Sequence, residues 1–285
     1  MATPHGAARI LDRPSQNALL VAPLVTTEWL GEQLHDEGIR VVDTRFYLAE
    51  PARGRAEYEA GHVPGSRYLS LDDDLTGATG PGRHPLPDTN WFAARLNTMG
   101  IGDDHTVVVY DQSDAGIAAR LWWMLRSLGH ASVVVLDGGW DAWVAEFRST
   151  TTEVPVWESS KLNLASEWSG TVARETIADG TEALFLIDSR APERHRGEVE
   201  PIDPIAGHIP GSFNIPYRGN TDDTGRFLPT ERLQERFVAV DTAARVVCYC
   251  GSGVTACNNI LAMAIAGIDD ALLYPGSWSG WIEGK

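Results

Sequence analysis

The sequence predicts an α/β protein made of two tandem homologous domains, each a mainly parallel sheet flanked by helices. One observation behind this prediction is that blocks from the first half recur in the same order about 140 residues later. A second is that short runs rich in Val, Ile and Leu alternate with helix-like stretches, a pattern typical of parallel sheets. The length of 285 residues also agrees with two domains.

Four pairs of blocks carry the duplication. The first pair has Asp and Arg after an apolar run, and the second is a Gly-His-x-Pro-Gly turn. The third pair ends at Asp111 in the first half and at Cys250 in the second, and the fourth holds tryptophans. In order, the pairs are 41–45 with 186–190, 61–66 with 207–212, 107–111 with 246–250, and 136–143 with 274–281. The offset is far too long for a solenoid repeat, so we predict two homologous domains.

The expected strands and helices alternate in the same way in both halves. The helix after Asp111 is expected from about Ala115 to Gly129, and the helix after Thr255 is expected to end at Gly267, because Gly is favoured just past helix ends. Strands are expected at 39–42, 107–110, 133–136, 184–187 and 245–249. The resulting organisation is a flexible N-terminal arm at 1–21, a first domain at 22–145, a linker at 146–171 and a second domain at 172–285.

Composition and charge exclude several function classes. The formal net charge of −16 argues against nucleic acid and anionic membranes as partners, since both require a basic surface. The three cysteines form neither a disulfide framework nor a zinc pattern, so we expect no metal, no cofactor and a reducing compartment. No apolar run is long enough for a signal peptide or a membrane span, and a cytoplasmic location is therefore expected.

The loop that begins at Cys250 is the candidate active site. A cysteine between a buried strand and a helix lies where backbone N–H groups converge and where the helix dipole is positive. Neighbouring glycines let the backbone turn its amides inward, and neighbouring hydroxyls can donate hydrogen bonds. The pattern predicts a reactive thiolate at Cys250 in a cradle formed by Gly251, Ser252, Gly253, Val254 and Thr255.

The loop restricts the chemistry of that thiolate. A cysteine-dependent phosphatase needs an arginine six positions after the cysteine to grip the phosphate, and this chain has Ala256 there. An acyl-transfer protease needs a histidine partner, which sequence spacing does not exclude. Attack on a sulfur atom that then stays on the enzyme requires neither group. A different class, a redox sensor or binding module with a merely oxidisable cysteine, is the other hypothesis.

These motifs resemble the two-domain rhodanese superfamily, which contains the thiosulfate and 3-mercaptopyruvate sulfurtransferases. The resemblance rests on the two Gly-His-x-Pro-Gly blocks, the loop from Cys250 to Ala256 and the Trp-containing segment 276–281, and it covers residues 22–283. It implies a catalytically silent first domain, in agreement with Asp111, and an active site between the domains. It also implies sulfur transfer through a Cys250 persulfide to a thiophilic acceptor such as cyanide, a thiol or thioredoxin.

The resemblance also bears on the sulfur donor. Members that prefer mercaptopyruvate carry Gly-Ser after the cysteine, as here, and this implies that Ser252 assists proton movement. Those members use two arginines to bind the donor. Arg194 matches the first, but Ile202 and Asp203 stand where the second is expected, and an acidic residue there would repel an anionic donor. Mercaptopyruvate is the preferred prediction and thiosulfate the alternative.

Three further residues of the first domain are candidates. The resemblance places the histidine that matches His62 near the reactive serine, although its counterpart His208 in the second copy favours a structural role for both. Arg83 and His84 lie in an insertion that the second copy lacks, and such a loop can either line the shared cleft or remain on the surface. His62 and Arg83 are both kept among the residues predicted to contact the substrate.

Overall fold

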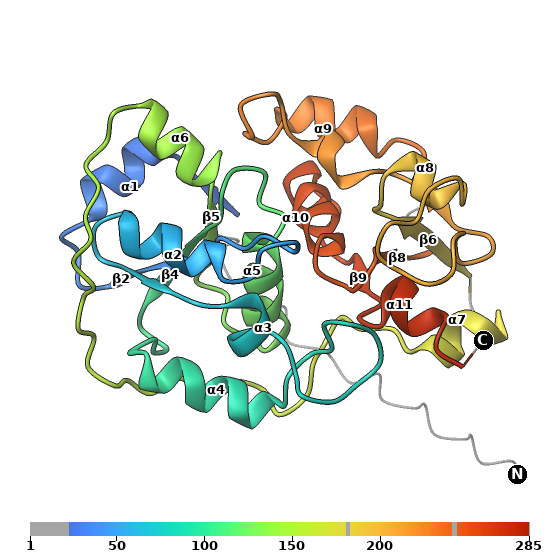
Figure 1. Ribbon diagram of the computed structural model, residues 1–285, viewed down its shortest axis with the longest axis horizontal. Coiled ribbons are helices and arrows are strands. Elements are labelled where there is room, and N and C mark those ends of the chain that lie inside the picture. The colour runs from blue at the N-terminus through green and yellow to red at the C-terminus, as the bar shows by residue number, and fades with distance from the viewer. Residues whose placement is uncertain (1–22, 181–182, 241–243, 285) are drawn as a thin grey trace, which may run out of the picture.

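The computed structural model describes residues 23–180, 183–240 and 244–284, so the predicted arm at 1–21 lies outside the described residues. The chain forms two α/β units that lie side by side, with their sheets on opposite sides of a central pair of helices (Figure 1). Each unit has a parallel sheet with helices packed around it, as the sequence predicts.

The first sheet has the strand order β1-β5-β4-β2-β3, and every pairing is parallel. Its strands are β1 (Leu24–Val25), β2 (Ile39–Asp43), β3 (Ser66–Tyr68), β4 (Thr106–Tyr110) and β5 (Val133–Leu136). Its helices are α1 (Thr27–Gln33), α2 (Arg53–Ala60), α3 (Leu71–Asp74), α4 (Thr89–Thr98), α5 (Ala118–Ser127) and α6 (Gly139–Ala145). The central strands β4 and β5 are almost wholly apolar and buried, as expected for a sheet covered on both faces.

The second sheet has the order β7-β6-β8-β9 and is also parallel throughout. Its strands are β6 (Leu184–Asp188), β7 (Phe213–Asn214), β8 (Arg245–Tyr249) and β9 (Leu272–Leu273). Its helices are α7 (Arg174–Asp179), α8 (Pro192–His195), the 3₁₀ helix η1 (Tyr217–Asn220), α9 (Thr230–Arg236), α10 (Ala256–Ala266) and α11 (Ser277–Trp281). Helix α10 ends at Gly267, whose φ of +90° suits the left-handed C-cap predicted from the sequence.

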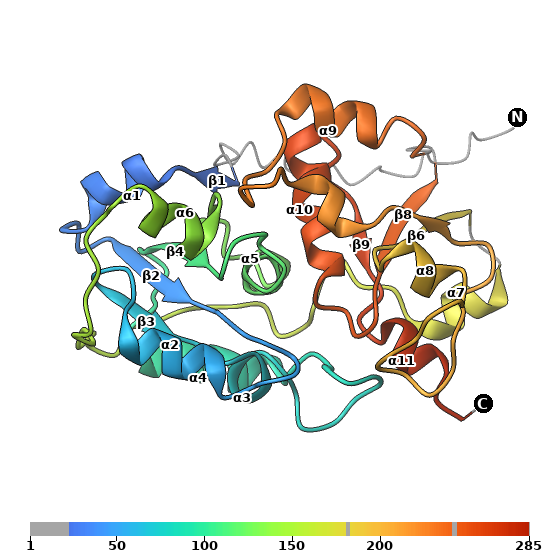
Figure 2. The same ribbon diagram turned by 45° about the horizontal axis from the view of Figure 1, so that its top comes forward.

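Helices α5 and α10 pack against each other where the two units meet, as Figures 1 and 2 both show. One continuous cluster of buried apolar side chains runs through this contact, with Leu121 and Trp122 on the α5 side and Ile260 and Leu261 on the α10 side. Close packing of this kind fixes the relative position of the two units. The loops that precede α5 and α10 are thereby held at one shared interface.

The segment 152–170 connects the two units without a helix or strand of its own. It is nevertheless anchored, because Leu162 is buried and Trp168 donates a hydrogen bond from Nε1 to the carbonyl of Pro87. No helix among the described residues is long and apolar enough to cross a membrane.

Candidate active site

A cavity of about 810 Å³ opens between the two units, and Cys250 lies in its wall. The second unit contributes the loop after β8 and the segment that contains α8, while the first unit contributes residues 46–50 and part of the insertion that holds Arg83 and His84. Because both units line it, the cavity exists only when they are packed together.

Backbone hydrogen bonds fix Cys250 at the end of β8. Its N–H donates to the hydroxyl of Ser277 at 3.1 Å, and its carbonyl accepts from the backbone N–H of Trp278 at 3.0 Å. Cys250 lines the cavity, whereas Cys248 and Cys257 are fully buried and do not. Burial raises the pKa of Cys257 to about 12 and holds that of Cys248 well above its ordinary value. Cys250 is therefore the cysteine that a molecule in the cavity can reach.

One position in the loop requires glycine, and a second leaves room for an arginine. A side chain at Gly253 would place its Cβ 2.5 Å from the carbonyl oxygen of Pro275, and the φ of Gly253 is +77°. A Cβ at Gly251 would lie 2.8 Å from Nη2 of Arg83. The glycines thus allow close approach of the loop to its own domain on one side and to an arginine on the other.

The backbone amides of the loop are open to an anion. Within the described part of the chain, the N–H groups of residues 251–255 donate to no acceptor. These groups precede α10, whose positive dipole end favours negative charge. Val254 and Thr255 complete the wall of the cavity at this end. The arrangement can therefore stabilise a negatively charged sulfur.

Ser252 forms a hydrogen bond with a histidine of the other unit. Its hydroxyl lies 2.7 Å from Nδ1 of His84, and both side chains are buried. Burial, assisted by the positive charges of Arg120 and Arg83, lowers the pKa of His84 to about 4, so the imidazole is neutral near pH 7. The carboxylate of Asp72 lies 3.6 Å from Nε2, which is too long for a hydrogen bond. The Ser252–His84 pair can hold or move a proton beside Cys250.

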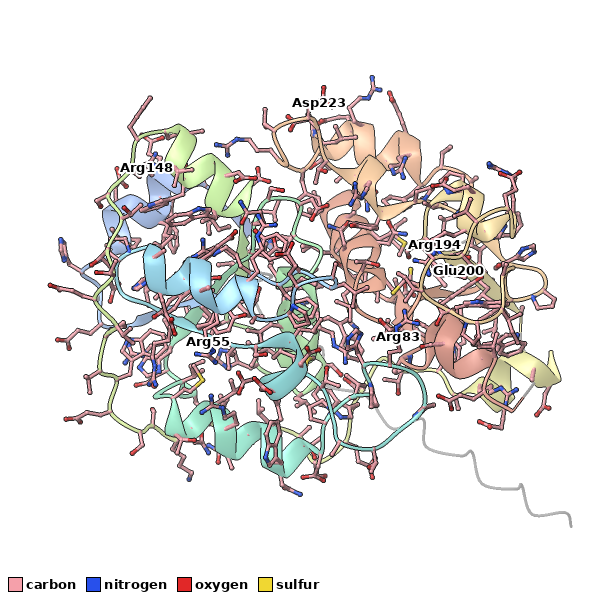
Figure 3. The ribbon with its side chains drawn as sticks, viewed as in Figure 1. Arg55, Arg83, Arg148, Arg194, Glu200 and Asp223 are labelled. Carbon is pink, nitrogen blue, oxygen red and sulfur yellow. The ribbon has the colours of Figure 1, made fainter. Side chains whose placement is uncertain are left out.

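Two arginines meet above Gly251, one from each unit. Nη2 of Arg83 lies 2.8 Å and Nη2 of Arg194 lies 3.6 Å from the point where a Gly251 Cβ would stand. Arg83 forms an ion pair with Asp203, and Arg194 binds Glu200 at 2.7 Å and Asp203 at 3.4 Å. Figure 3 shows Arg194 and Glu200 side by side, with Arg83 close to them at the junction of the units.

Asp203 therefore does not present a free negative charge to the cavity. Burial raises the pKa of its carboxyl, but both arginines favour the ionised form. The carboxylate of Glu200 is also buried, yet hydrogen bonds from Arg194 and from backbone amides lower its pKa. The repulsion of an anionic donor expected from the sequence is thus compensated by ion pairs.

His62 lies away from this site, contrary to the expectation drawn for it. Its ring is fully buried within the first unit and stacks on Tyr58 with ring centroids 3.9 Å apart. Nδ1 bonds to the carbonyl of Tyr58 at 2.7 Å, and Nε2 to the carbonyl of Glu153 at 3.1 Å. Both ring nitrogens are occupied by backbone groups, so His62 holds the Gly-His-Val-Pro-Gly turn and does not line the cavity.

The histidine that does reach Ser252 is His84, twenty-two residues further along the chain. The only sequence signal for it is the insertion that holds Arg83, which the second copy lacks. The family resemblance pointed to His62, although its recurrence as His208 favoured a structural role for both histidines. A residue that serves only the shared cavity has no reason to recur, and this asymmetry is the better indicator of function.

The comparisons with known proteins agree with the geometry. The sequence pattern of the Rhodanese-like domain matches residues 26–146 and 171–283. The chain belongs to the rhodanese family. The "Probable 3-mercaptopyruvate sulfurtransferase" of Pseudomonas aeruginosa is 41% identical over 272 residues, which are 92% of this chain and 95% of the relative. The thiosulfate sulfurtransferase of Cricetulus griseus is 34% identical over 278 residues, 93% of each chain.

A solved structure of a related enzyme matches almost the whole chain, including both units. The crystal structure of SseA from Escherichia coli, described as a 3-mercaptopyruvate sulfotransferase, is 30% identical with a TM-score of 0.81, and the match covers 91% of this chain and all of that one. The present rhodanese is accordingly an enzyme of the sulfurtransferase class. Relatives named for either donor match over almost the full length, so overall similarity does not separate the donors.

Proposed function

We propose that this rhodanese takes sulfur from 3-mercaptopyruvate as a persulfide on Cys250 and passes it to a thiophilic acceptor. The observation that carries the proposal is the buried Ser252–His84 hydrogen bond beside Cys250. It supports a donor that must lose and regain a proton during the reaction. Thiosulfate has no thiol proton at neutral pH, whereas mercaptopyruvate does.

In the first half-reaction the Cys250 thiolate attacks the donor sulfur. The carbon–sulfur bond breaks, and its electron pair passes to the carbon as the enolate of pyruvate. His84, neutral near pH 7, accepts the donor's thiol proton through Ser252 at Nδ1, and the same pair returns a proton to the enolate carbon. In the second half-reaction an acceptor thiolate or cyanide attacks the outer sulfur and releases the Cys250 thiolate.

The donor carboxylate is proposed to bind between the two arginines above Gly251. Arg194 and Arg83 stand there with Nη2 atoms close to the loop, and Asp203 ties both of them in place. Planar guanidinium groups suit a carboxylate because they can donate two parallel hydrogen bonds. The sequence has Asp203 where the second donor-binding arginine is expected. In this proposal Arg83, from the first domain, takes the place of that arginine.

The acceptor and the location of the enzyme are proposed more broadly. An acceptor can be cyanide, a small thiol or a protein thiol such as thioredoxin, since the cavity opens to solvent between the units. A cytoplasmic location is proposed because all three cysteines are free thiols, which a reducing compartment preserves.

The proposal is tested by steady-state turnover of the purified protein with each donor and by intact mass after incubation with donor alone. We expect a larger kcat/KM for mercaptopyruvate than for thiosulfate, and one added sulfur that Cys250→Ser abolishes. The matched control is Cys257→Ser, which should keep the adduct. An equal or larger kcat/KM for thiosulfate would overturn the donor assignment, and absence of the adduct with both donors would favour the redox or binding-module hypothesis.

The arginine pair is tested separately with Arg83→Met. We expect the KM for mercaptopyruvate to rise by about 10-fold or more, because a charge-assisted hydrogen bond contributes roughly 1.5–3 kcal/mol. Arg55→Met is the control, since Arg55 is an exposed arginine of the same domain on α2, away from the cavity (Figure 3). An unchanged KM in Arg83→Met would remove Arg83 from the donor site.

A further inference from the structure

Arg120 is a fully buried arginine in the first turn of α5, in the silent domain. Removing a guanidinium from water costs several kcal/mol unless an opposite charge and hydrogen bonds compensate for it. Among the described residues, no Asp or Glu forms an ion pair with Arg120. Its hydrogen-bond acceptors are three backbone carbonyls, and its Nε atom has no partner at all. A buried cation without a counter-charge calls for a functional explanation.

The hydrogen bonds of Arg120 join both sides of the active site. Nη1 donates to the carbonyl of Gly253 in the cysteine loop at 2.9 Å. Nη2 donates to the carbonyl of His84 at 3.0 Å and to that of Leu75 at 3.3 Å. The carbonyl of Gly253 also accepts a weak hydrogen bond from the thiol of Cys257 at 3.5 Å. One side chain of the silent domain thus holds the loop of the nucleophile and the loop of its proton partner.

The ionisable groups that interact with Arg120 are His84, whose pKa the positive charge of Arg120 helps to lower, and two thiols. Burial lowers the pKa of Arg120, although an arginine stays protonated in proteins, and the charges that oppose this shift come from Cys257 and Cys250. Burial raises the pKa of Cys257 to about 12, so that thiol is neutral at pH 7. Of the two thiols, Cys250 is the one that lines the cavity. A thiolate or persulfide formed there would supply the negative charge that Arg120 lacks.

The other charges around Cys250 are compensated or neutral. Arg83 is paired with Asp203, and Arg194 with Glu200. His84 is neutral near pH 7 because burial lowers its pKa, and Cys248 is a neutral buried thiol. The charged side chains at the mouth of the cavity are exposed and screened by solvent, namely Glu50, Glu193 and Arg218.

We infer that Arg120 is a positioning residue that supplies the counter-charge for the Cys250 thiolate and persulfide, and that fixes the loops of Cys250 and His84 around them. The inference rests on the proposed role of Cys250 as the nucleophile. It assigns the silent domain an electrostatic part in the chemistry, in addition to forming a wall of the cavity.

The test measures the alkylation rate of Cys250 by iodoacetamide against pH, with peptide mapping to separate the three cysteines. Arg120→Met and Arg120→Gln remove the charge, and the glutamine keeps a donor for the Gly253 carbonyl. We expect the midpoint of the pH profile to rise by about one pH unit in both variants, which corresponds to about tenfold slower alkylation at lower pH. Arg120→Lys keeps the charge and should keep the midpoint.

Arg126→Met is the matched control, because it removes an arginine near the other end of the same helix, where Arg126 packs over Trp122. It should leave the midpoint unchanged. If Arg120→Met does not fold, the Gln and Lys pair decides the question. Equal midpoints in wild type and Arg120→Gln would overturn the inference and leave Arg120 a structural residue. Alkylation does not depend on turnover, so failure of the sulfur-transfer proposal would be seen separately in the donor assays.

Discussion

The loops that follow β4 and β8 share a backbone hydrogen bond but begin with different side chains, a carboxyl group at Asp111 and a thiol at Cys250. The carbonyl of Asp111 accepts from the N–H of Trp140 at 2.9 Å, just as the carbonyl of Cys250 accepts from that of Trp278 at 3.0 Å. In both copies a helix starts a few residues later. The difference lies in what fills the space between the loop and the helix.

In the loop after β4, the backbone amides are filled by the carboxyl group of Asp111. The carboxylate of Asp111 accepts hydrogen bonds from the backbone N–H groups of Ala115, Ile117 and Ala118 at 3.2, 2.7 and 2.9 Å. In the second copy the amides after Cys250 are open, and the side chain is a thiol that the cavity can reach. The fold therefore provides an anion-binding loop twice, and only the copy with unfilled amides can hold a reacting sulfur.

A swap of the two side chains would produce the largest effect. In Cys250→Asp we expect turnover to fall by about 10³-fold or more, because the nucleophile is lost while the amides gain an anion. Adding Asp111→Cys should restore nothing, since Asp111 is buried and does not line the cavity. The measurement is kcat with the better donor, and circular dichroism checks the fold. Sulfur transfer by the double variant would show that the loop after β4 can also hold a reacting sulfur, and would contradict the contrast drawn between the two loops.

Loss of the cross-domain proton partner should have an intermediate effect. In His84→Asn we expect kcat to fall by about 10²-fold, the usual contribution of a positioned acid–base group. In wild type, protonation of His84 near pH 4 should remove this acceptor and lower kcat. His62→Asn is the control for a buried histidine outside the cavity and should leave kcat close to wild type. Equal losses in the two variants would show that His84 acts through the fold alone.

The smallest effect concerns the contribution of Asp111, in the loop after β4, to stability. Burial raises the pKa of Asp111 to about 7, more than its three N–H donors lower it. Because the folded state then holds the proton more tightly than the unfolded chain, the free energy of unfolding should fall between about pH 4 and 7 and level off above. Asp111→Asn lacks this titration. Relative to that variant, wild type should lose a few kcal/mol at most over this range, measured by urea unfolding.

Asp223→Asn serves as the matched control, since Asp223 is exposed in a loop before α9 (Figure 3). Its free energy of unfolding should change with pH in the same way as that of wild type. The prediction would be wrong if the free energies of unfolding of wild type and Asp111→Asn differed by a constant amount from pH 4 to 7. That result would mean that the three amides keep the Asp111 carboxylate ionised over the whole range.

Other contacts show how far the duplication extends. Arg45 forms an ion pair with Asp43 and bonds the carbonyl of Gly61 at 2.8 Å. Arg190 repeats both contacts with Asp188 and Gly207, the latter at 2.7 Å. Contacts present in both copies support the fold, and the sequence alone located these residues because repetition reveals them. The family resemblance misled at one histidine, since it pointed to His62 and the structure places His84 beside Ser252.

The sequence by itself determined the two-domain α/β architecture, the position of Cys250 and the glycines around it. These depend on local patterns, namely apolar runs that form buried strands and a loop whose own residues shape the cradle. Only the tertiary structure decided which distant groups reach the sulfur. The approach of His84 to Ser252, the ion pairs of Asp203 with two arginines and the burial of Arg120 against the Gly253 carbonyl all depend on how α5 packs on α10. The packing of one domain on another follows from the shape of the whole core, which no short segment of sequence encodes.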